Sequence, residues 1–330
     1  MAGVDISAIV VNWNTRRLLL QCLRVLGSAL HGLSHEIWVV DNGSQDGSMD
    51  AARVEFPAAQ IIANQENLGY ARAVNQALAR LTGRYVLLLN TDALPMADAI
   101  HYLYAFLEKN PEAAAVGGQL LHPEGTRQNS IANFPSLTTE LLNKSLLQML
   151  LSQRFPGKGR HYADPVEVES VVGACLLVRA EVIDEIGPLD EGYFFFLEET
   201  DWCYRMQQTG YKIYHVPQAR IYHLQGASVR GFEAESRIEY HRARFRFFRK
   251  HRGRLQTGLL AGGTLFRVGM DAVTLGLLSL LTGLRDTRVR RKAWVAFRLF
   301  AWYLRGCPAA GGLPRISETP SAERADAAGG

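Results

Sequence analysis

The chain has 330 residues, of which 48% are hydrophobic and 21% are charged. This ordinary globular composition excludes a disordered or fibrous protein. Lysine and arginine exceed aspartate and glutamate by only 36 − 32 = 4. The four cysteines (22, 175, 203 and 307) are too scattered for a CxxC metal site and too few for a disulfide scaffold, so we expect buried thiols in a reducing cytosol.

The first residues show no export signal, and a strand-like run begins at Ile6. Between residues 6 and 121, strands are expected at 7–11, 36–40, 60–63, 85–89 and 114–121, and helices at 15–30, 48–56 (capped by Ser48), 70–81 and 97–109. Continuous apolar strands separated by helices predict βαβ units, and therefore a mostly parallel sheet with helices on both faces.

Polar clusters follow four of these strands, at residues 12–14, 41–44, 64–69 and 90–92. Turn chemistry alone explains any one of them. Ligands of parallel sheets bind at the carboxyl ends of the strands. Four clusters at that edge therefore favour a ligand site.

Residues 122–170 read as a long polar loop around one helical patch at 137–151. A strand containing Gly173 is expected at 171–178, followed by a helix at 200–208 capped by Thr200 and by strands at 211–215 and 219–223.

An acidic cluster, Glu198, Glu199 and Asp201, directly follows the aromatic run 193–197. Burial of that run brings the carboxylates toward a low-dielectric site, where their pKa values rise and general-base chemistry becomes accessible. Alternatively, the acids simply suit the positive end of a helix dipole. Both can hold at once.

The last third of the chain differs in composition from the rest. A basic helix is expected at 233–251, and seven arginines and lysines between 242 and 254 have no acid among them, which indicates a polyanionic neighbour. The apolar stretch 258–284 is interrupted by Arg267 and Asp271, and basic and aromatic residues continue to 305. We expect an interfacial membrane helix, because the uncharged part is too short to span a bilayer. The alternative is a helical hairpin packed on the domain or on a second subunit.

In their order, the motifs resemble the family 2 glycosyltransferases, inverting enzymes of the GT-A type that include rhamnosyltransferases of bacterial polysaccharide synthesis. The matching segments are residues 9–14, 39–44, 66–70 with Asn75, 87–92, 194–205 and 214–217 with His223 and Ser228. The resemblance implies an α/β GT-A catalytic domain over 1–230, with a nucleotide-sugar half (1–121) and an acceptor and base half (122–230). A helical extension (231–310) and a disordered tail (311–330) would follow.

The resemblance also assigns roles to residues. The nucleotide sugar would be bound by Val11, Asn12, Asp41, Asn67, Gly69, Asn75, Asn90 and Asp92. Asp41 would face the nucleobase, and Asp92, with His223 as a second ligand, would hold Mg²⁺ or Mn²⁺. Asn90 replaces the first acid of the family's Asp-x-Asp metal motif. Glu199 would be the catalytic base, where the family commonly has Asp, with Glu198 and Asp201 as alternatives.

The implied reaction transfers a sugar from a dTDP-rhamnose or UDP-hexose type donor to a lipid-linked or polysaccharide acceptor, at the cytoplasmic face of an anionic cell membrane. Two alternatives come from other classes. A sugar-nucleotide pyrophosphorylase would need a glycine-rich phosphate loop, which residues 12–15 lack. A nucleic-acid-binding protein using helix 240–254 would leave the acidic motifs unexplained, so we expect no nucleic acid. The donor, the acceptor and a homo-oligomeric state stay open.

Overall fold

The computed structural model describes residues 3–142, 161–224, 231–309 and 311–313. The chain divides into two compact units. The first contains residues 1–134, 150–228 and 315–319, and the second contains 135–149, 229–314 and 320–330. The second unit thus joins a segment from the middle of the chain to the C-terminal helices.

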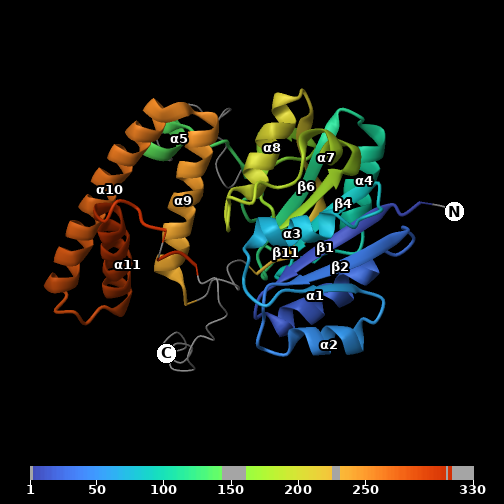
Figure 1. Ribbon diagram of the computed structural model, residues 1–330, viewed down its shortest axis with the longest axis horizontal. Coiled ribbons are helices and arrows are strands. Elements are labelled where there is room, and N and C mark those ends of the chain that lie inside the picture. Colours follow the sequence, from blue (N-terminus) through green and yellow to red (C-terminus); the bar gives the residue numbers. More distant parts are fainter. Residues whose placement is uncertain (1–2, 143–160, 225–230, 310, 314–330) are drawn as a thin grey trace. The chain divides into compact units, whose positions relative to one another are not determined.

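The N-terminal half of the first unit is a set of parallel strands (Figure 1). The strand order β3-β2-β1-β4 joins β1 (Ile6–Asn12), β2 (His35–Asp41), β3 (Gln60–Ala63) and β4 (Tyr85–Asn90), and the connections contain α1 (Arg16–Ala29), α2 (Ser48–Glu55) and α3 (Tyr70–Leu78). These bounds lie within a few residues of those expected. The predicted α/β fold is confirmed.

The second half makes the sheet mixed. β10 (Cys175–Arg179) lies antiparallel between β4 and β6 (Ala113–Leu121), and β11 (Lys212–His223) runs parallel to β6. The short strands β5 (Ala93–Pro95) and β8 (Val166–Val168) pair antiparallel with β11, and β7 (Ile131–Ala132) pairs with β9 (Ser170–Val171) in a separate small sheet.

Two expected strand assignments are corrected here. The stretch 171–178 is divided between β9 and β10, because the chain leaves one sheet and enters the other around Gly173. The expected strands 211–215 and 219–223 form the single strand β11, with an irregular register between Val216 and Arg220. Pro217 has no N–H to donate, which accounts for the break in pairing there.

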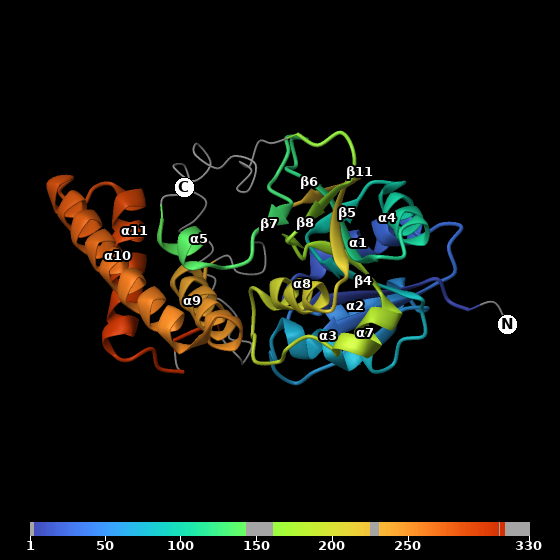
Figure 2. The same cartoon turned by 90° about the horizontal axis from the view of Figure 1, so that it is seen from above.

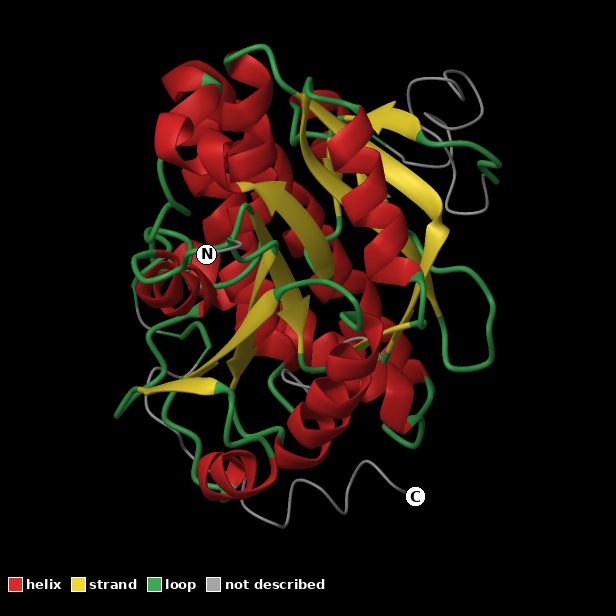
Figure 3. Ribbon diagram, turned by 90° about the vertical axis from the view of Figure 1, so that its right-hand side faces the viewer, coloured by secondary structure: helices red, strands yellow, loops and turns green. Residues whose placement is uncertain are grey.

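Helices cover both faces of the sheet (Figure 3). The helices α1, α2 and α4 (Ala99–Lys109) pack on the face that carries Ala8 and Val10. The opposite face, which carries Ile9, is covered by α3, α7 (Ala180–Ile186) and α8 (Glu198–Gln208). Because both faces are buried, the strands are continuously apolar, as the sequence predicted.

Two expected caps are also corrected. Gly47 is the N-cap of α2, in the left-handed conformation with φ of 74°, and Ser48 is the first helical residue. Thr200 is inside the first turn of α8, which begins at Glu198 after Leu197 with φ of 64°. In both cases the preceding turn fixes where the helix starts, and that turn depends on backbone geometry that a capping pattern does not reveal.

The second unit consists of α5 (Leu137–Leu141), α9 (Glu233–His251), α10 (Gly253–Leu281) and α11 (Thr287–Leu304), seen from two sides in Figures 1 and 2. Ser136 caps α5 by accepting the Thr139 N–H at 3.2 Å. The rest of the helix expected to 151, Ser228 and the tail from 314 lie outside the described residues.

Arginines of the basic stretch hold α5 inside this unit. The Arg244 guanidinium is buried, pairs with Glu140 at 2.9 Å and donates to Thr264 Oγ1 at 3.1 Å. Arg252 donates to the Pro135 carbonyl at 3.1 Å. Part of the positive charge of this stretch is therefore neutralised or hydrogen-bonded within the unit.

Gly69 allows a close backbone approach between two loops of the first unit that are far apart in sequence. Its φ is +86°, and a Cβ there would lie 2.6 Å from the Phe194 carbonyl oxygen. Gly32 has a similar φ of +82° with no atom within 4 Å of its Cβ position. We expect Gly69→Ala to lower thermal stability clearly more than Gly32→Ala, since the second change adds only backbone strain of about 1 kcal/mol or more. Equal melting temperatures for the two variants would contradict this contact.

Candidate active site

The ends of β1 and β2 form a buried hydrogen-bonded cluster. Asn12 donates from Nδ2 to Asp41 Oδ1 at 2.8 Å, and Ser44 donates its backbone N–H to Asp41 Oδ2 at 2.9 Å. The Ser44 hydroxyl donates to Asp41 Oδ1 at 2.5 Å, and Thr15 holds Asn12 Oδ1 at 2.7 Å. Asp41 is 2% exposed, so its orientation is fixed before any ligand binds.

The Asp41 carboxylate keeps acceptor capacity, because two oxygens provide about four lone-pair sites and the three contacts above fill only part of them. Val11 lies beside it, paired in register with Val40 on one side and Asn90 on the other. The expected residues Val11, Asn12 and Asp41 are therefore adjacent at one strand edge.

The loop after β3 continues this edge. Asn67 is buried and accepts the Gly69 N–H at 3.0 Å, and the Gly69 carbonyl accepts from Asn42 at 3.2 Å. Asn64 in turn donates to Asn42 Oδ1 at 3.1 Å. Asparagine amides thus connect the ends of β2 and β3 and fix the loop conformation.

Asn75, which the resemblance assigns to nucleotide-sugar binding, has its side-chain amide bound to another segment of the protein. Its Nδ2 donates to the Leu189 carbonyl at 2.9 Å and to Glu191 at 3.2 Å, and its Oδ1 accepts the Leu189 N–H at 3.1 Å. Both ends of the amide are engaged, so the geometry makes Asn75 a positioning residue for the segment that leads to the acidic cluster.

Asp92 and His223 come together across β5 and β11. Asp92 Oδ1 lies 3.5 Å from His223 Nε2, and both residues are buried. Gln128 donates from Nε2 to the His223 carbonyl at 2.6 Å, which directs its Oε1 to His223 Nδ1 at 3.0 Å. Since an amide oxygen only accepts, the proton of a neutral His223 lies on Nδ1.

That tautomer directs the Nε2 lone pair toward an Asp92 oxygen, an arrangement suited to a shared cation. No cluster of three metal-ligating side chains occurs in the described ranges. The pair therefore fits a hard divalent ion that takes its other ligands from phosphate and water. Asn90, half-buried at the end of β4, places a neutral amide where the family motif has its first acid.

The three expected acids lie in the first turn of α8. Two consecutive residues with positive φ precede them, Phe196 at 73° and Leu197 at 64°. Non-glycine residues in this region are strained, and such strain concentrates at functional sites. Asp201 is fully buried, pairs with Arg205 at 3.0 Å and accepts from the Tyr193 hydroxyl at 3.3 Å.

Both Asp201 oxygens are thus engaged, and Arg205 also donates to the carbonyls of Ile186 and Pro188, at 2.7 and 2.6 Å. The environment of Asp201 is that of a structural ion pair and argues against its expected role as an alternative base.

Glu199 lies in a different environment. Burial raises the pKa of its carboxyl group, and backbone N–H groups, including that of Gly173 at 3.3 Å, act in the opposite direction. A Cβ on Gly173 would lie 3.1 Å from Glu199 Cγ, so a glycine there makes room for the side chain. A carboxyl with a raised pKa and no salt bridge among the described residues has the properties of a general base.

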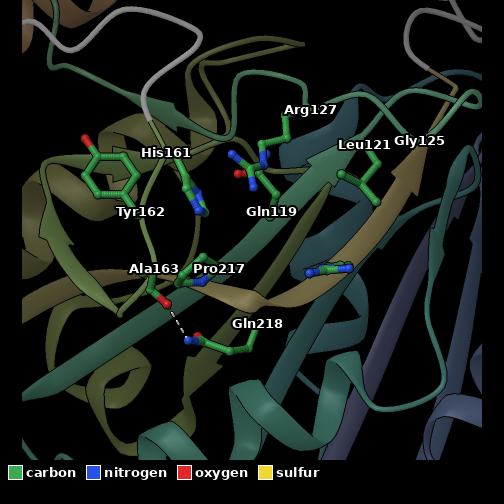
Figure 4. A pocket seen from close by; sticks show the side chains of 10 residues that line it. Gln119, Leu121, Gly125, Arg127, His161, Tyr162, Ala163, Pro217 and Gln218 are labelled. Carbon is green, nitrogen blue, oxygen red and sulfur yellow. Dashed lines mark hydrogen bonds between the residues drawn. The ribbon is translucent and has the colours of Figure 1, made fainter.

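A further cavity of about 240 Å³ lies elsewhere in the first unit (Figure 4). It is lined by residues of β6, β11 and the segment 161–163, and Gln218 donates to the Ala163 carbonyl at its edge. No residue expected for the site lines it.

The profile of the "Glycosyl transferase family 2" family matches residues 7–187. The chain belongs to this family. It is 27% identical over 230 residues to N-acetylglucosaminyl-diphospho-decaprenol L-rhamnosyltransferase of Mycobacterium tuberculosis, covering 64% of this chain and 73% of the relative. It is 25% identical to the low-salt glycan biosynthesis hexosyltransferase Agl10 of Haloferax volcanii, covering 84% and 81%.

Among solved structures, the mannosyltransferase PcManGT of Pyrobaculum calidifontis, in complex with GDP-Man and Mn²⁺, has the same fold. The two chains superpose with a TM-score of 0.55 at 17% identity over 92% of this chain and 89% of that one. This glycosyltransferase fold, with additional C-terminal helices, agrees with the predicted one.

Sequence reasoning missed several residues that shape the site. The sequence places Ser44 in a polar cluster and Thr15 at the start of a helix, and neither position predicts that these residues fix Asp41 and Asn12. Gln128 comes from the loop that the sequence left unassigned, and no local pattern marks it as a partner of His223. Only the pairing of β6 with β11 brings the two together.

Proposed function

We propose that this glycosyltransferase is an inverting enzyme that moves a sugar from a nucleoside diphosphate donor to a hydroxyl of a lipid-linked or polysaccharide acceptor. The observation that carries the proposal is Glu199, a half-buried side chain in the first turn of α8 whose carboxyl pKa is raised by loss of solvation. Asp41 and Asp92 follow the ends of β2 and β4 of the same sheet.

In the proposed single displacement, Asp41 accepts a hydrogen bond from the nucleobase. Glu199 accepts the proton of the acceptor hydroxyl as its oxygen attacks the anomeric carbon. The bond from that carbon to the donor phosphate breaks on the opposite side, so the configuration inverts.

Asp92 and His223 would hold Mg²⁺ or Mn²⁺, which neutralises growing charge on the departing nucleoside diphosphate. Support comes from the 3.5 Å approach of the two side chains and from the Gln128 contact that sets the His223 tautomer. The similar mannosyltransferase structure contains Mn²⁺.

For the donor we propose a dTDP-rhamnose or UDP-hexose type sugar, and for the acceptor a polyprenyl-linked glycan of cell-surface polysaccharide synthesis. The Mycobacterium relative is described as a rhamnosyltransferase acting on a sugar-diphospho-decaprenol, and the Haloferax relative as a hexosyltransferase. Both descriptions agree with a donor and an acceptor of these classes.

Glu199→Gln is expected to lower turnover by about a hundredfold or more while donor binding persists, the usual scale for loss of a general base. Because burial raises the pKa above the ordinary 4.5, the wild-type kcat/KM should fall as pH drops through that raised value. The variant should lack this acid limb. Initial rates across pH would measure both effects.

Asp201→Asn is the matched comparison. It should lower the melting temperature strongly, since breaking a buried ion pair costs about 3–5 kcal/mol, whereas Glu199→Gln should not. A variant at Glu199 with near-normal turnover would move the base role to Glu198.

Asp92→Ala should weaken the Mn²⁺-dependent part of UDP or dTDP binding, because the diphosphate loses a bridged counter-charge. Gln128→Ala should weaken the same binding by about 10-fold or more, because it removes the hydrogen bond that orients His223. The loss should be smaller than that caused by Asp92→Ala. Asp98→Ala removes an exposed carboxylate and serves as the control. Calorimetry with and without Mn²⁺ measures these differences, and nucleotide binding and turnover that are insensitive to EDTA would reject the metal assignment.

We further propose that the second unit contacts an anionic membrane at the cytoplasmic face. By length and composition α10 is able to cross a membrane, and 17% of its most apolar window is buried. Seven of its exposed apolar residues follow one another at intervals of three, four or seven, which places them on one face: Leu255, Leu259, Phe266, Met270, Val273, Leu277 and Leu281. Leu278 and Leu280 are exposed as well.

Basic residues flank this face at 285, 288 and 290–292, and exposed Trp294 and Phe297 follow in α11. An apolar face beside positive charge is typical of helices that lie in the interface of anionic bilayers. The proposal is therefore an interfacial helix rather than a span, because Arg267 and Asp271 interrupt the apolar sequence.

The double change Phe266→Asp and Leu277→Asp should release the protein from anionic phospholipid vesicles in a sedimentation assay. Val54→Asp, at a side chain 84% exposed in the first unit, should have no effect. High salt should weaken binding of the wild type only in part, since it screens the charges and not the apolar contact. Wild-type protein that stays in the supernatant would refute the membrane proposal.

A further inference from the structure

Tyr70 enters the site between the donor loops and the acidic cluster. It is the first residue of α3 and directly follows Gly69, whose carbonyl is bound by Asn42. The Tyr70 backbone N–H donates to the Phe194 carbonyl at 2.7 Å. Position 70 is thus fixed on one side to the loops after β2 and β3, and on the other to the aromatic run that leads into Glu198.

The Tyr70 hydroxyl is buried and has no hydrogen-bond partner in the part of the chain that the structure describes, although the residue as a whole is partly exposed. A buried hydroxyl left unpaired destabilises the folded protein, because it has lost its hydrogen bonds to water. The buried Thr15 hydroxyl of the same site, by contrast, has Asn12 and Thr91 as partners. An unpaired hydroxyl at a ligand site indicates that a ligand supplies its partner.

The electrostatic surroundings keep this hydroxyl protonated. Burial raises the pKa of Tyr70, and the nearby charges of Glu198 and Glu199 raise it further. The group is therefore a neutral hydrogen-bond donor close to the proposed base, at the place where the transferred sugar must lie between nucleotide and acceptor.

We propose that the Tyr70 hydroxyl binds the transferred sugar, donating a hydrogen bond to one hydroxyl oxygen of the sugar on the nucleotide donor. This inference rests on the proposed function. The donor sugar is favoured over the acceptor because Tyr70 continues the loop after β3, on the nucleotide side of the site. A site built to bind a sugar hydroxyl discriminates strongly against a sugar that lacks it.

The test is Tyr70→Phe, which removes only the hydroxyl. UDP-glucose, dTDP-rhamnose, UDP and dTDP serve as calorimetric probes of the full chain. We expect the variant to bind the sugar nucleotide that the wild type accepts about 10-fold or more weakly, while its affinity for the corresponding nucleoside diphosphate stays unchanged. Its melting temperature should be equal or higher, because an unpaired buried group is removed.

Tyr102→Phe, at an exposed tyrosine of α4, is the matched control and should change neither affinity nor stability. Three outcomes would overturn the assignment: unchanged sugar-nucleotide affinity, an equal loss for sugar nucleotide and nucleoside diphosphate, or a lowered melting temperature, which would mark a structural hydroxyl. If the wild type binds none of a panel of nucleotide sugars, the proposed function itself fails, and this result is separate from any effect of Tyr70→Phe.

Discussion

The geometry of the site depends on one backbone contact, the hydrogen bond from the Tyr70 N–H to the Phe194 carbonyl, made possible by Gly69. It joins the loop after β3 to the segment that carries the acids, although the two are more than a hundred residues apart in sequence. A Cβ at position 69 would lie only 2.6 Å from the Phe194 carbonyl oxygen. The spacing between these two segments is therefore set by main-chain atoms.

Two further contacts support the same segment. Asn75 holds the backbone of Leu189, and Arg205 holds the carbonyls of Ile186 and Pro188 while paired with Asp201. Positive φ values at Phe196 and Leu197 are then sustained by the surrounding contacts. The two acids acquire different chemistry in this way, because Asp201 is fully buried beside a counter-charge, whereas Glu199 is half-buried, has a raised carboxyl pKa and has no salt bridge among the described residues.

In the second unit, arginines bind α5, whereas exposed apolar side chains lie on α10. The buried pair Arg244 and Glu140 fastens α5 to α9, and Arg267 donates to the Glu140 and Leu141 carbonyls. Arg244 of α9 and Arg267 of α10 are thus both directed at α5. The apolar residues of α10 remain exposed along one face instead. Lipid is the environment that suits such a face with basic residues at its end.

The sequence by itself determined the α/β fold, most element boundaries and the edge at which the polar residues gather, because these follow from local periodicity and from the fixed geometry of parallel strands. It also identified Asp41, Asp92, His223 and Glu199 as candidates through an ordered set of motifs. Only the tertiary structure decided which contacts each of these candidate residues and their neighbours make. Asp201 is paired with Arg205, His223 is oriented by Gln128 from a distant loop, and the Tyr70 hydroxyl has no partner in the part of the chain that the structure describes. The first pair joins residues four apart on one helix, a spacing that the sequence contains. The other two facts depend on burial and on contacts between residues far apart in the chain, and these have no local signature in the sequence.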